Sequence, residues 1–283
     1  MMATNGGDED RLGVKRAHPA RLYDFYLGGK TNYPADRETA AEVLGANPNA
    51  MVAARENRGF MHRAVRYVVE QHGIRQFVDI GTGIPTEPNL HQVAQQFAPD
   101  ARVVYTDNDP IVLTYARALL TGTREGRTDY IDADVREPDR ILEQADKTLD
   151  LSEPACLSVV ALFHFVGDDA DPHGLTQRLL DAMAPGSALI LSHATEDFDP
   201  EDATTGTMRE LGRVYRSRGM TLALRDKATT ERFFHQAGTE IADPGLTPSH
   251  EWRTELEIDQ KPRLAGMVSA AEVGVWAGVG IKS

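Results

Sequence analysis

The sequence predicts an α/β fold with a mostly parallel sheet, preceded by a helical extension. From Gln76 onward, short apolar runs rich in β-branched residues alternate with helical segments, which is the pattern of βαβ units. Two of these runs, 157–163 and 188–192, are continuously apolar, as expected for strands that are covered on both faces. The 283 residues are 41% apolar and 26% charged, so a globular domain with a large core is expected.

The chain before Gln76 is expected to contain an unstructured leader and two helices. The leader is polar, mixed in charge and without periodicity. A first helix is expected from Pro19 to the glycine pair at 28–29, because proline suits the first helical turn. A second is expected over 51–72, where apolar residues recur at helical spacing before a glycine. The chain is therefore divided into a disordered leader, an N-terminal helical extension and the main domain, at residues 1–17, 18–59 and 60–283.

Strands and helices then alternate up to residue 192, and the pattern loosens after Thr195. Asp109 and Pro110 mark the start of one helix, because aspartate is a preferred N-cap residue, and Gly122 is expected to end it. No internal repeat or long linker divides this part of the chain. The expected strands are 76–80, 102–106, 130–133, 157–163, 188–192, 239–242 and 272–281, and the expected helices are 89–97, 110–120, 175–183, 208–216 and 229–236.

Composition excludes several classes of protein. The net charge of −13 disfavours a nucleic-acid partner, because such proteins bind by neutralising phosphates. The single cysteine, Cys156, excludes a disulfide within the chain and a thiolate-rich zinc site, and no histidine spacing indicates a metal. The apolar stretches are shorter than the roughly 20 residues that cross a bilayer, and the first residues resemble no targeting peptide. We therefore expect a cytoplasmic protein without a membrane partner; its oligomeric state is left open.

The segment 77–86, which reads FVDIGTGIPT, is an apolar strand followed by a glycine-rich turn and then a helix. Gly81 and Gly83 lack Cβ, so the backbone can turn tightly and a ligand can lie against it. The start of the following helix offers N–H groups. This arrangement indicates a nucleotide-binding turn, although a simple strand-to-helix turn has the same pattern.

Acidic residues follow the next two expected strands. Asp107 ends the second strand, where a carboxylate accepts hydrogen bonds from the vicinal hydroxyls of an adenosine ribose. Asp134 follows the third strand and is placed to accept from an adenine amino group, although a solvated strand end explains it equally well. Since ligands of open parallel sheets bind at the carboxyl ends of the strands, these residues are expected to form one site.

Two cofactors suit such an edge: a dinucleotide and S-adenosylmethionine. A dinucleotide turn has a third glycine where this chain has Thr86, and the Asp79 carboxylate would repel a pyrophosphate. A cationic methionine tail tolerates that carboxylate. The residues therefore favour S-adenosylmethionine.

These motifs resemble those of class I S-adenosylmethionine-dependent methyltransferases, over roughly residues 60–283. More narrowly, segments 20–32, 79–89 and 192–195 resemble a group of actinobacterial methyltransferases of undefined substrate. The resemblance implies a Rossmann-like seven-stranded sheet, with helices on both faces and an antiparallel last strand beside the fifth. Pro85 stands where the family usually has a third glycine, so the methionine tail is expected to be held differently. The resemblance implies that the cofactor-binding residues are Asp79, Gly81, Thr82, Gly83, Asp107, Asn108, Asp134 and Val135.

Histidines and the extension are the candidates for the acceptor side. His164 and His193 follow the fourth and fifth expected strands and are candidate general bases; a structural role, with bonds to backbone, is the alternative. The extension is interpreted as a lid over the acceptor, or alternatively as a packing helix. Arg58 is a candidate partner of the methionine carboxylate, or a solvated helix residue. The lid residues expected to contact the substrate are Tyr23, Tyr26, Lys30 and Asn32.

The sequence thus predicts an S-adenosylmethionine-dependent methyltransferase that acts on a small molecule. The alternative is a non-catalytic protein that binds S-adenosylmethionine or a related adenosyl metabolite as a sensor or assembly partner.

Overall fold

A mostly parallel sheet forms the centre of the molecule. The computed structural model describes residues 13–119, 122–258 and 267–283. The strands in these ranges are β1 (Gln76–Ile80), β2 (Arg102–Asp107), β3 (Arg127–Asp132), β4 (Cys156–Val160), β5 (Ala188–Ala194), β6 (Thr239–Ile241), β7 (Thr247–Pro248) and β8 (Val275–Lys282).

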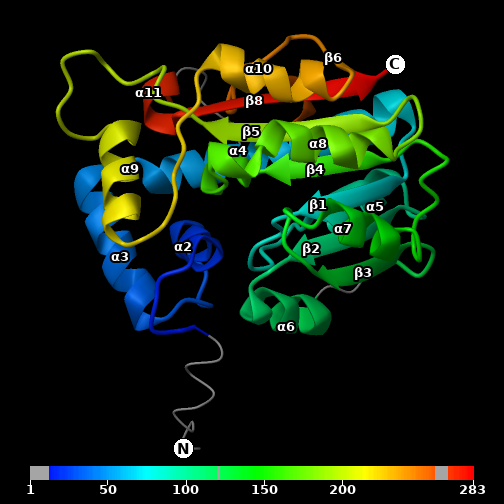
Figure 1. Ribbon diagram of the computed structural model, residues 1–283, viewed down its shortest axis with the longest axis horizontal. Coiled ribbons are helices and arrows are strands. Elements are labelled where there is room, and N and C mark those ends of the chain that lie inside the picture. Colours follow the sequence, from blue (N-terminus) through cyan, green and yellow to red (C-terminus); the bar gives the residue numbers. More distant parts are fainter. Residues whose placement is uncertain (1–12, 120–121, 259–266) are drawn as a thin grey trace, which may run out of the picture.

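The strand order is β3-β2-β1-β4-β5-β8-β6, with the short β7 also paired to β8 (Figure 1). β1 to β5 are parallel, and β8 runs antiparallel between β5 and β6. This confirms the predicted sheet with its antiparallel last strand beside the fifth; β7 is an addition. The register sets Asp79 of β1 between Tyr105 of β2 and Ser158 of β4.

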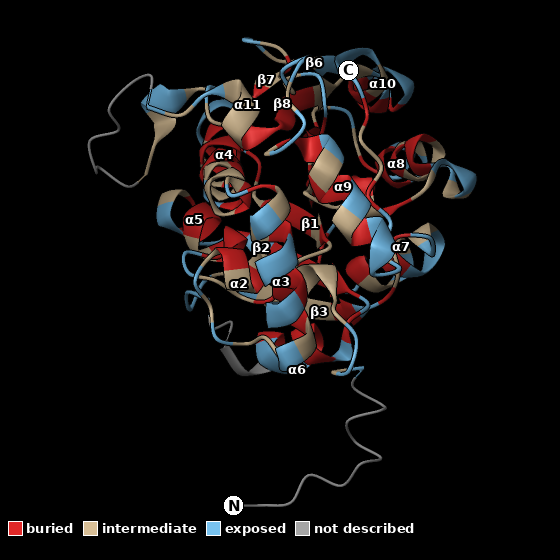
Figure 2. Ribbon diagram, turned by 90° about the vertical axis from the view of Figure 1, so that its left-hand side faces the viewer, coloured by how far each residue is buried: buried red, intermediate tan, exposed pale blue. Residues whose placement is uncertain are grey.

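Helices cover both faces of the sheet. In Figure 2, α4 and α5 lie on one side of the strands and α7, α8 and α10 on the other, and each group packs on its own apolar core. The helices are α2 (Pro19–Tyr26), α3 (Pro34–Ala46), α4 (Ala50–His72), α5 (Leu90–Phe97), α6 (Pro110–Leu119), α7 (Pro138–Ala145), α8 (Pro172–Asp181), α9 (Met208–Ser217), α10 (Lys227–Gln236) and α11 (Ala270–Val273), with 3-10 helices η1 (Phe163–Phe165), η2 (Asp168–Ala170) and η3 (Thr254–Leu256).

The extension lies at the edge of the sheet toward which β4 points. There α2, α3 and α9 gather in front of the strand ends, as both views show (Figures 1 and 2). Leu22 of α2 and Val43 of α3 are fully buried in an apolar cluster that also contains Leu211 and Tyr215 of α9. Burying each aliphatic side chain stabilises the fold by about 1.5–3 kcal/mol, so this cluster fixes the extension on the domain.

Two predicted strands have different bounds. β4 ends at Val160 and not at residue 163, because Ala161 adopts a positive φ of 56° and the chain continues into η1. The expected strand 272–281 is divided: α11 ends at Val273, Gly274 after it has a left-handed conformation, and β8 begins at Val275. Both corrected bounds affect the site, because the chain turns at Ala161 and at Gly274, at the edge of the sheet where ligands are expected to bind.

Other differences concern short segments. β3 begins at Arg127, three residues before the predicted start, and helices α3 and α7 were not predicted. Residues 13–16 of the expected leader form a turn, which is closed by a hydrogen bond from Arg16 N–H to Gly13 O. Residues 1–12 of the leader lie outside the described part of the chain. Residues 120–121, just before the expected helix end at Gly122, lie outside it as well. Within the described ranges, no helix is both long and apolar enough to span a membrane.

Candidate functional site

A cavity of about 380 Å³ opens at the carboxyl ends of β1 to β4. Its volume lies in the lower part of the range of roughly 300–1,000 Å³ that holds drug-sized ligands. The residues that follow these strands form its floor, and α2 and α4 contribute wall residues. All eight residues predicted to bind the cofactor line it: Asp79, Gly81, Thr82, Gly83, Asp107, Asn108, Asp134 and Val135.

The glycine turn after β1 requires glycine for two reasons. Gly81 has a φ of +74° and Gly83 a φ of +66°, which disfavour residues with a side chain. A Cβ added at Gly81 would lie 2.6 Å from Leu162 Cδ1, so the loop after β4 also packs against this glycine. The turn therefore joins the ends of β1 and β4 at the floor of the cavity.

Asp79 is the last-but-one residue of β1, and its carboxylate faces the cavity. Its Oδ1 accepts a 2.6 Å hydrogen bond from Ser158 Oγ of the neighbouring strand. Burial raises the pKa of Asp79 to about 6, although the Ser158 bond and the charge of Arg58 act in the opposite direction. A buried carboxylate with a raised pKa favours a cationic ligand beside it.

Asp107 has a role that the sequence did not reveal. Its Oδ2 accepts from the N–H of Gly83 at 2.8 Å and its Oδ1 from the N–H of Asp109 at 2.9 Å. Burial raises its pKa, while these two backbone bonds lower it. The side chain is 8% exposed and lines the cavity, so it both shapes the glycine turn and retains lone pairs for a ligand.

Asn108, Asp134 and Arg136 form a polar group at the far end of the cavity. Asp134 Oδ2 accepts from Asn108 Nδ2 at 2.8 Å and from Arg136 Nη2 at 2.6 Å. The Arg136 bond is the largest cause that lowers the pKa of Asp134 to about 2. Val135, 6% exposed, adds an apolar surface beside these groups. A planar ring with polar edges suits such a combination.

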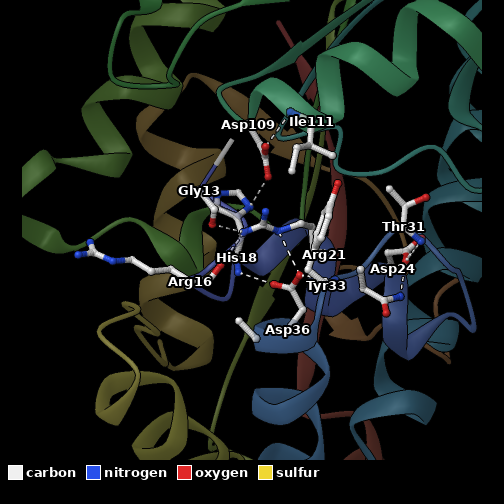
Figure 3. A network of polar contacts seen from close by, with 12 residues as sticks. Gly13, Arg16, His18, Arg21, Asp24, Thr31, Tyr33, Asp36, Asp109 and Ile111 are labelled. Carbon is white, nitrogen blue, oxygen red and sulfur yellow. Dashed lines mark hydrogen bonds and ion pairs between the residues drawn. The ribbon is translucent and has the colours of Figure 1, made fainter. Parts of the chain in front are cut away.

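The aspartate predicted as a helix cap performs that role. Asp109 Oδ1 accepts from the N–H of Ile111 at 2.8 Å, at the start of α6, and this prediction is confirmed. Its Oδ2 also lies 3.1 Å from His18 Nδ1, just ahead of α2 (Figure 3). The extension and the cofactor edge are thus joined through one carboxylate.

The two candidate general bases do not line the cavity. His193 is fully buried; its Nδ1 bonds Ala194 O at 2.8 Å, and its Nε2 lies 2.7 Å from Arg225 Nη1. His164 Nδ1 accepts from Ala194 N–H at 3.3 Å. Burial, the largest cause, lowers the pKa of His164 to about 3 and that of His193 well below its usual value. Both imidazoles pack as neutral groups, His164 in η1 and His193 on the neighbouring β5.

Of the four predicted lid residues, only Tyr23 lines the cavity. Its hydroxyl donates to Ala54 O at 3.0 Å and accepts from Asn57 Nδ2 at 3.2 Å, both on α4. The other three lie elsewhere: the Tyr26 hydroxyl meets that of Tyr215, Lys30 is exposed, and Asn32 donates to Asp24.

Three residues of the extension that were not predicted to contact the substrate, His18, Pro19 and Ala20, line the cavity. They are held by a network in which Asp36, fully buried, accepts from His18 N–H at 3.0 Å and lies 3.3 Å from Arg21 Nε (Figure 3). No sequence pattern indicated these residues, because the buried ion pair between α2 and α3 that holds them is apparent only in the folded structure.

The site's chemistry is defined by its donor set. It combines a glycine turn, carboxylates after three successive strands and an apolar wall, and no cluster of metal-ligating side chains occurs within the described ranges. With the strand order, this defines the class of S-adenosylmethionine-dependent methyltransferases. The chain belongs to the S-adenosyl methyltransferase family, whose model matches residues 5–283.

Solved structures agree with this assignment. A DUF574 family protein from Streptomyces avermitilis is 41% identical, with a TM-score of 0.88, and the match covers 96% of this chain and 100% of that one. A candidate methyltransferase from Thermobifida fusca is 33% identical, with a TM-score of 0.81 and coverage of 99% and 100%. No curated protein sequence matches the chain. The protein is an S-adenosylmethionine-dependent methyltransferase.

Proposed function

We propose that this methyltransferase acts on a small molecule that enters the cavity beneath α2. The observation that carries the proposal is that the eight cofactor residues and three adjoining residues of the extension line one cavity of about 380 Å³. A cavity of this size takes a small acceptor more readily than a folded macromolecule. The net charge of −13 supports an acceptor other than nucleic acid, and we also propose a cytoplasmic location.

The cofactor fits the groups that are present. S-adenosylmethionine supplies a methyl group on a cationic sulfonium centre, which transfers by in-line displacement. Asp79, an anion with a raised pKa, is proposed to bind the α-amino group, and Asp107 the ribose hydroxyls. Asn108, Asp134 and Val135 are proposed to surround the adenine.

The remaining chain residues position the acceptor and exclude water. Phe165 and Val166, which follow β4, line the cavity and are proposed to contact the acceptor. We assign no proton transfer to His164 or His193. We propose instead that they hold η1 in place, since their ring nitrogens bond to β5 backbone and to Arg225.

Calorimetric titration tests the cofactor site. Wild-type protein is titrated with S-adenosylmethionine, S-adenosylhomocysteine and NAD, and the first two are expected to bind. Asp107→Ala should weaken their binding by about 1–3 kcal/mol through loss of hydrogen bonds to a charged group. Asp139→Ala, at a carboxylate 72% exposed on α7, is the matched control and should leave affinity unchanged. Binding of NAD alone, or equal affinities for both variants, would overturn the assignment.

The acceptor class is tested with methyl-labelled S-adenosylmethionine and an actinobacterial extract separated by ultrafiltration. Label incorporated into the low-molecular-mass fraction supports the proposal. Label found only in protein or RNA of the retained fraction refutes a small-molecule acceptor.

A further inference from the structure

We propose that Arg58 of α4 binds the α-carboxylate of the cofactor's methionine part, opposite Asp79, which takes the α-amino group. This inference rests on the proposed cofactor site. It assigns a binding residue that lies outside the glycine turn and outside the strands of the sheet.

The first argument is that the glycine turn has few N–H groups left for a carboxylate. Gly81 and Thr82 both donate to Thr106 O, at 2.8 and 3.2 Å. Gly83 donates to Asp107 Oδ2. These backbone groups, which lie against the cavity, are therefore occupied by β2 and not by a ligand.

The residues after the turn are equally committed. Pro85 has no N–H, and Thr86 donates to Asn89 Oδ1 at 3.0 Å. At the first turn of α5, the N–H of His91 donates to the Tyr105 hydroxyl at 2.8 Å. Several N–H groups at this helix start are thus already bonded within the protein, so a side-chain donor would strengthen the binding of a carboxylate.

Arg58 is placed to be that donor. Its Nη2 donates to the backbone carbonyls of Thr86 and Pro88, the latter at 3.0 Å, and this fixes the guanidinium beside the turn. The hydrogen bonds found in the described ranges leave its Nη1 without a partner, and the side chain lines the cavity. Burial lowers its pKa, but an arginine side chain remains charged at neutral pH. The alternative of a solvated helix residue does not describe this position.

The charges of Arg58 and Asp79 complete the argument. Each acts on the other: Arg58 lowers the pKa of Asp79, and Asp79 raises that of Arg58. Yet no ion pair joins them within the described part of the chain, although both line the same cavity. Arg58 and Asp79 are both half-buried, and two opposite charges that face one cavity without touching lose hydration that a ligand lying between them would compensate. An amino-acid zwitterion supplies the two complementary charges.

Tyr23 connects this subsite to the extension. The phenol group of Tyr23 raises the pKa of Arg58. Its hydroxyl bonds Ala54 and Asn57, in the turn of α4 that precedes Arg58. The carboxylate subsite and the extension therefore share one helix.

The test compares ligands that differ only in the amino-acid part. Calorimetry is performed with S-adenosylhomocysteine, its decarboxylated analogue and 5′-methylthioadenosine. Arg58→Gln should weaken S-adenosylhomocysteine binding about 10- to 100-fold, the effect of losing hydrogen bonds between charged groups, and leave 5′-methylthioadenosine unchanged. Arg58→Lys should retain part of the affinity, because lysine keeps the charge without the planar fork. Arg55→Gln, at an exposed arginine of the same helix, is the control.

The outcomes separate the possibilities. Equal weakening of all three ligands by Arg58→Gln would mean that Arg58 only supports the turn, and no change would mean that the carboxylate lies elsewhere; either result overturns the inference. If Arg58→Gln does not fold, Arg58→Lys decides, because it should lose part of the affinity for S-adenosylhomocysteine and keep the affinity for the decarboxylated analogue; an unchanged ratio of the two affinities overturns the inference. Failure of wild-type protein to bind any of the three would instead refute the proposed cofactor site.

Discussion

Replacing Gly81 with alanine should destabilise the protein by about 2–5 kcal/mol. The φ of +74° costs a residue with a side chain about 1–2 kcal/mol. The new Cβ would lie 2.6 Å from Leu162 Cδ1 and 3.2 Å from its Cγ, so Leu162 must move, and such overpacking costs about 1–3 kcal/mol. The two costs act on different atoms and are expected to add.

Equilibrium unfolding in urea measures the change, with the free energy of unfolding extrapolated to water. Gly45→Ala is the matched control: it lies exposed in α3 with no atom within 4 Å of an added Cβ, so it should stabilise by about 0.5–1 kcal/mol. In the Leu162→Ala background, Gly81→Ala should retain only the cost of its φ. If Gly81→Ala and Gly45→Ala shift stability in the same direction, the strain assigned to this turn is absent.

Three further perturbations test the site. Because the pKa of Asp79 is raised to about 6, its carboxylate ionises as pH rises from 5 to 7. Calorimetry should therefore show tighter binding of S-adenosylmethionine as the pH rises over this range. Asp79→Asn should remove this pH dependence of the affinity. The same raised pKa stabilises the ligand-free fold most below about pH 4, and this stabilisation is lost as pH rises through 6. Urea unfolding at a series of pH values should show this trend for the wild-type protein and not for Asp79→Asn. Arg225→Gln removes bonds to Phe163 O and His193, so stability should fall by about 2–4 kcal/mol and hydrogen exchange should accelerate around η1; unchanged exchange would contradict its role in holding that loop. His18→Ala breaks the contact with Asp109, so stopped-flow should show faster cofactor release with a stability loss below about 1 kcal/mol, whereas an unchanged release rate would separate α2 from the site.

The sheet and the cofactor edge were predictable because they depend on local patterns. Continuous apolar runs predicted β4 and β5, whose residues are nearly all buried. The last residues of parallel strands must also lie at the same edge of the sheet. That is why all eight cofactor candidates line one cavity. Helix α3 was missed because its apolar residues form only a weak stripe, and α7 because it is short and buries only Ile141 and Ala145.

The two histidines predicted as general bases show where local patterns are insufficient. The prediction extended β4 to residue 163, which sets His164 directly at the ligand edge. The positive φ of Ala161 ends the strand earlier and starts η1, so the His164 ring turns toward β5. Its surroundings include Arg225, 61 residues further along the chain by number, which bonds His193 and the carbonyl of Phe163. Contacts between such distant segments leave no spacing signal in the sequence.

Two different parts of the fold line the cavity, and this indicates which residues determine acceptor specificity. Asp79, Asp107 and Asp134 belong to the strand ends, and their positions follow from the sheet that the whole methyltransferase class shares. Another wall comes from α2 and from the loop after β4, and its shape depends on contacts outside the sheet, such as the buried pair of Arg21 and Asp36. With the cofactor against the strand ends, as proposed, the wall made by α2 and η1 is the part of the cavity left to contact the acceptor. Substitutions in that wall should therefore change which molecule is methylated while the affinity for the cofactor stays constant.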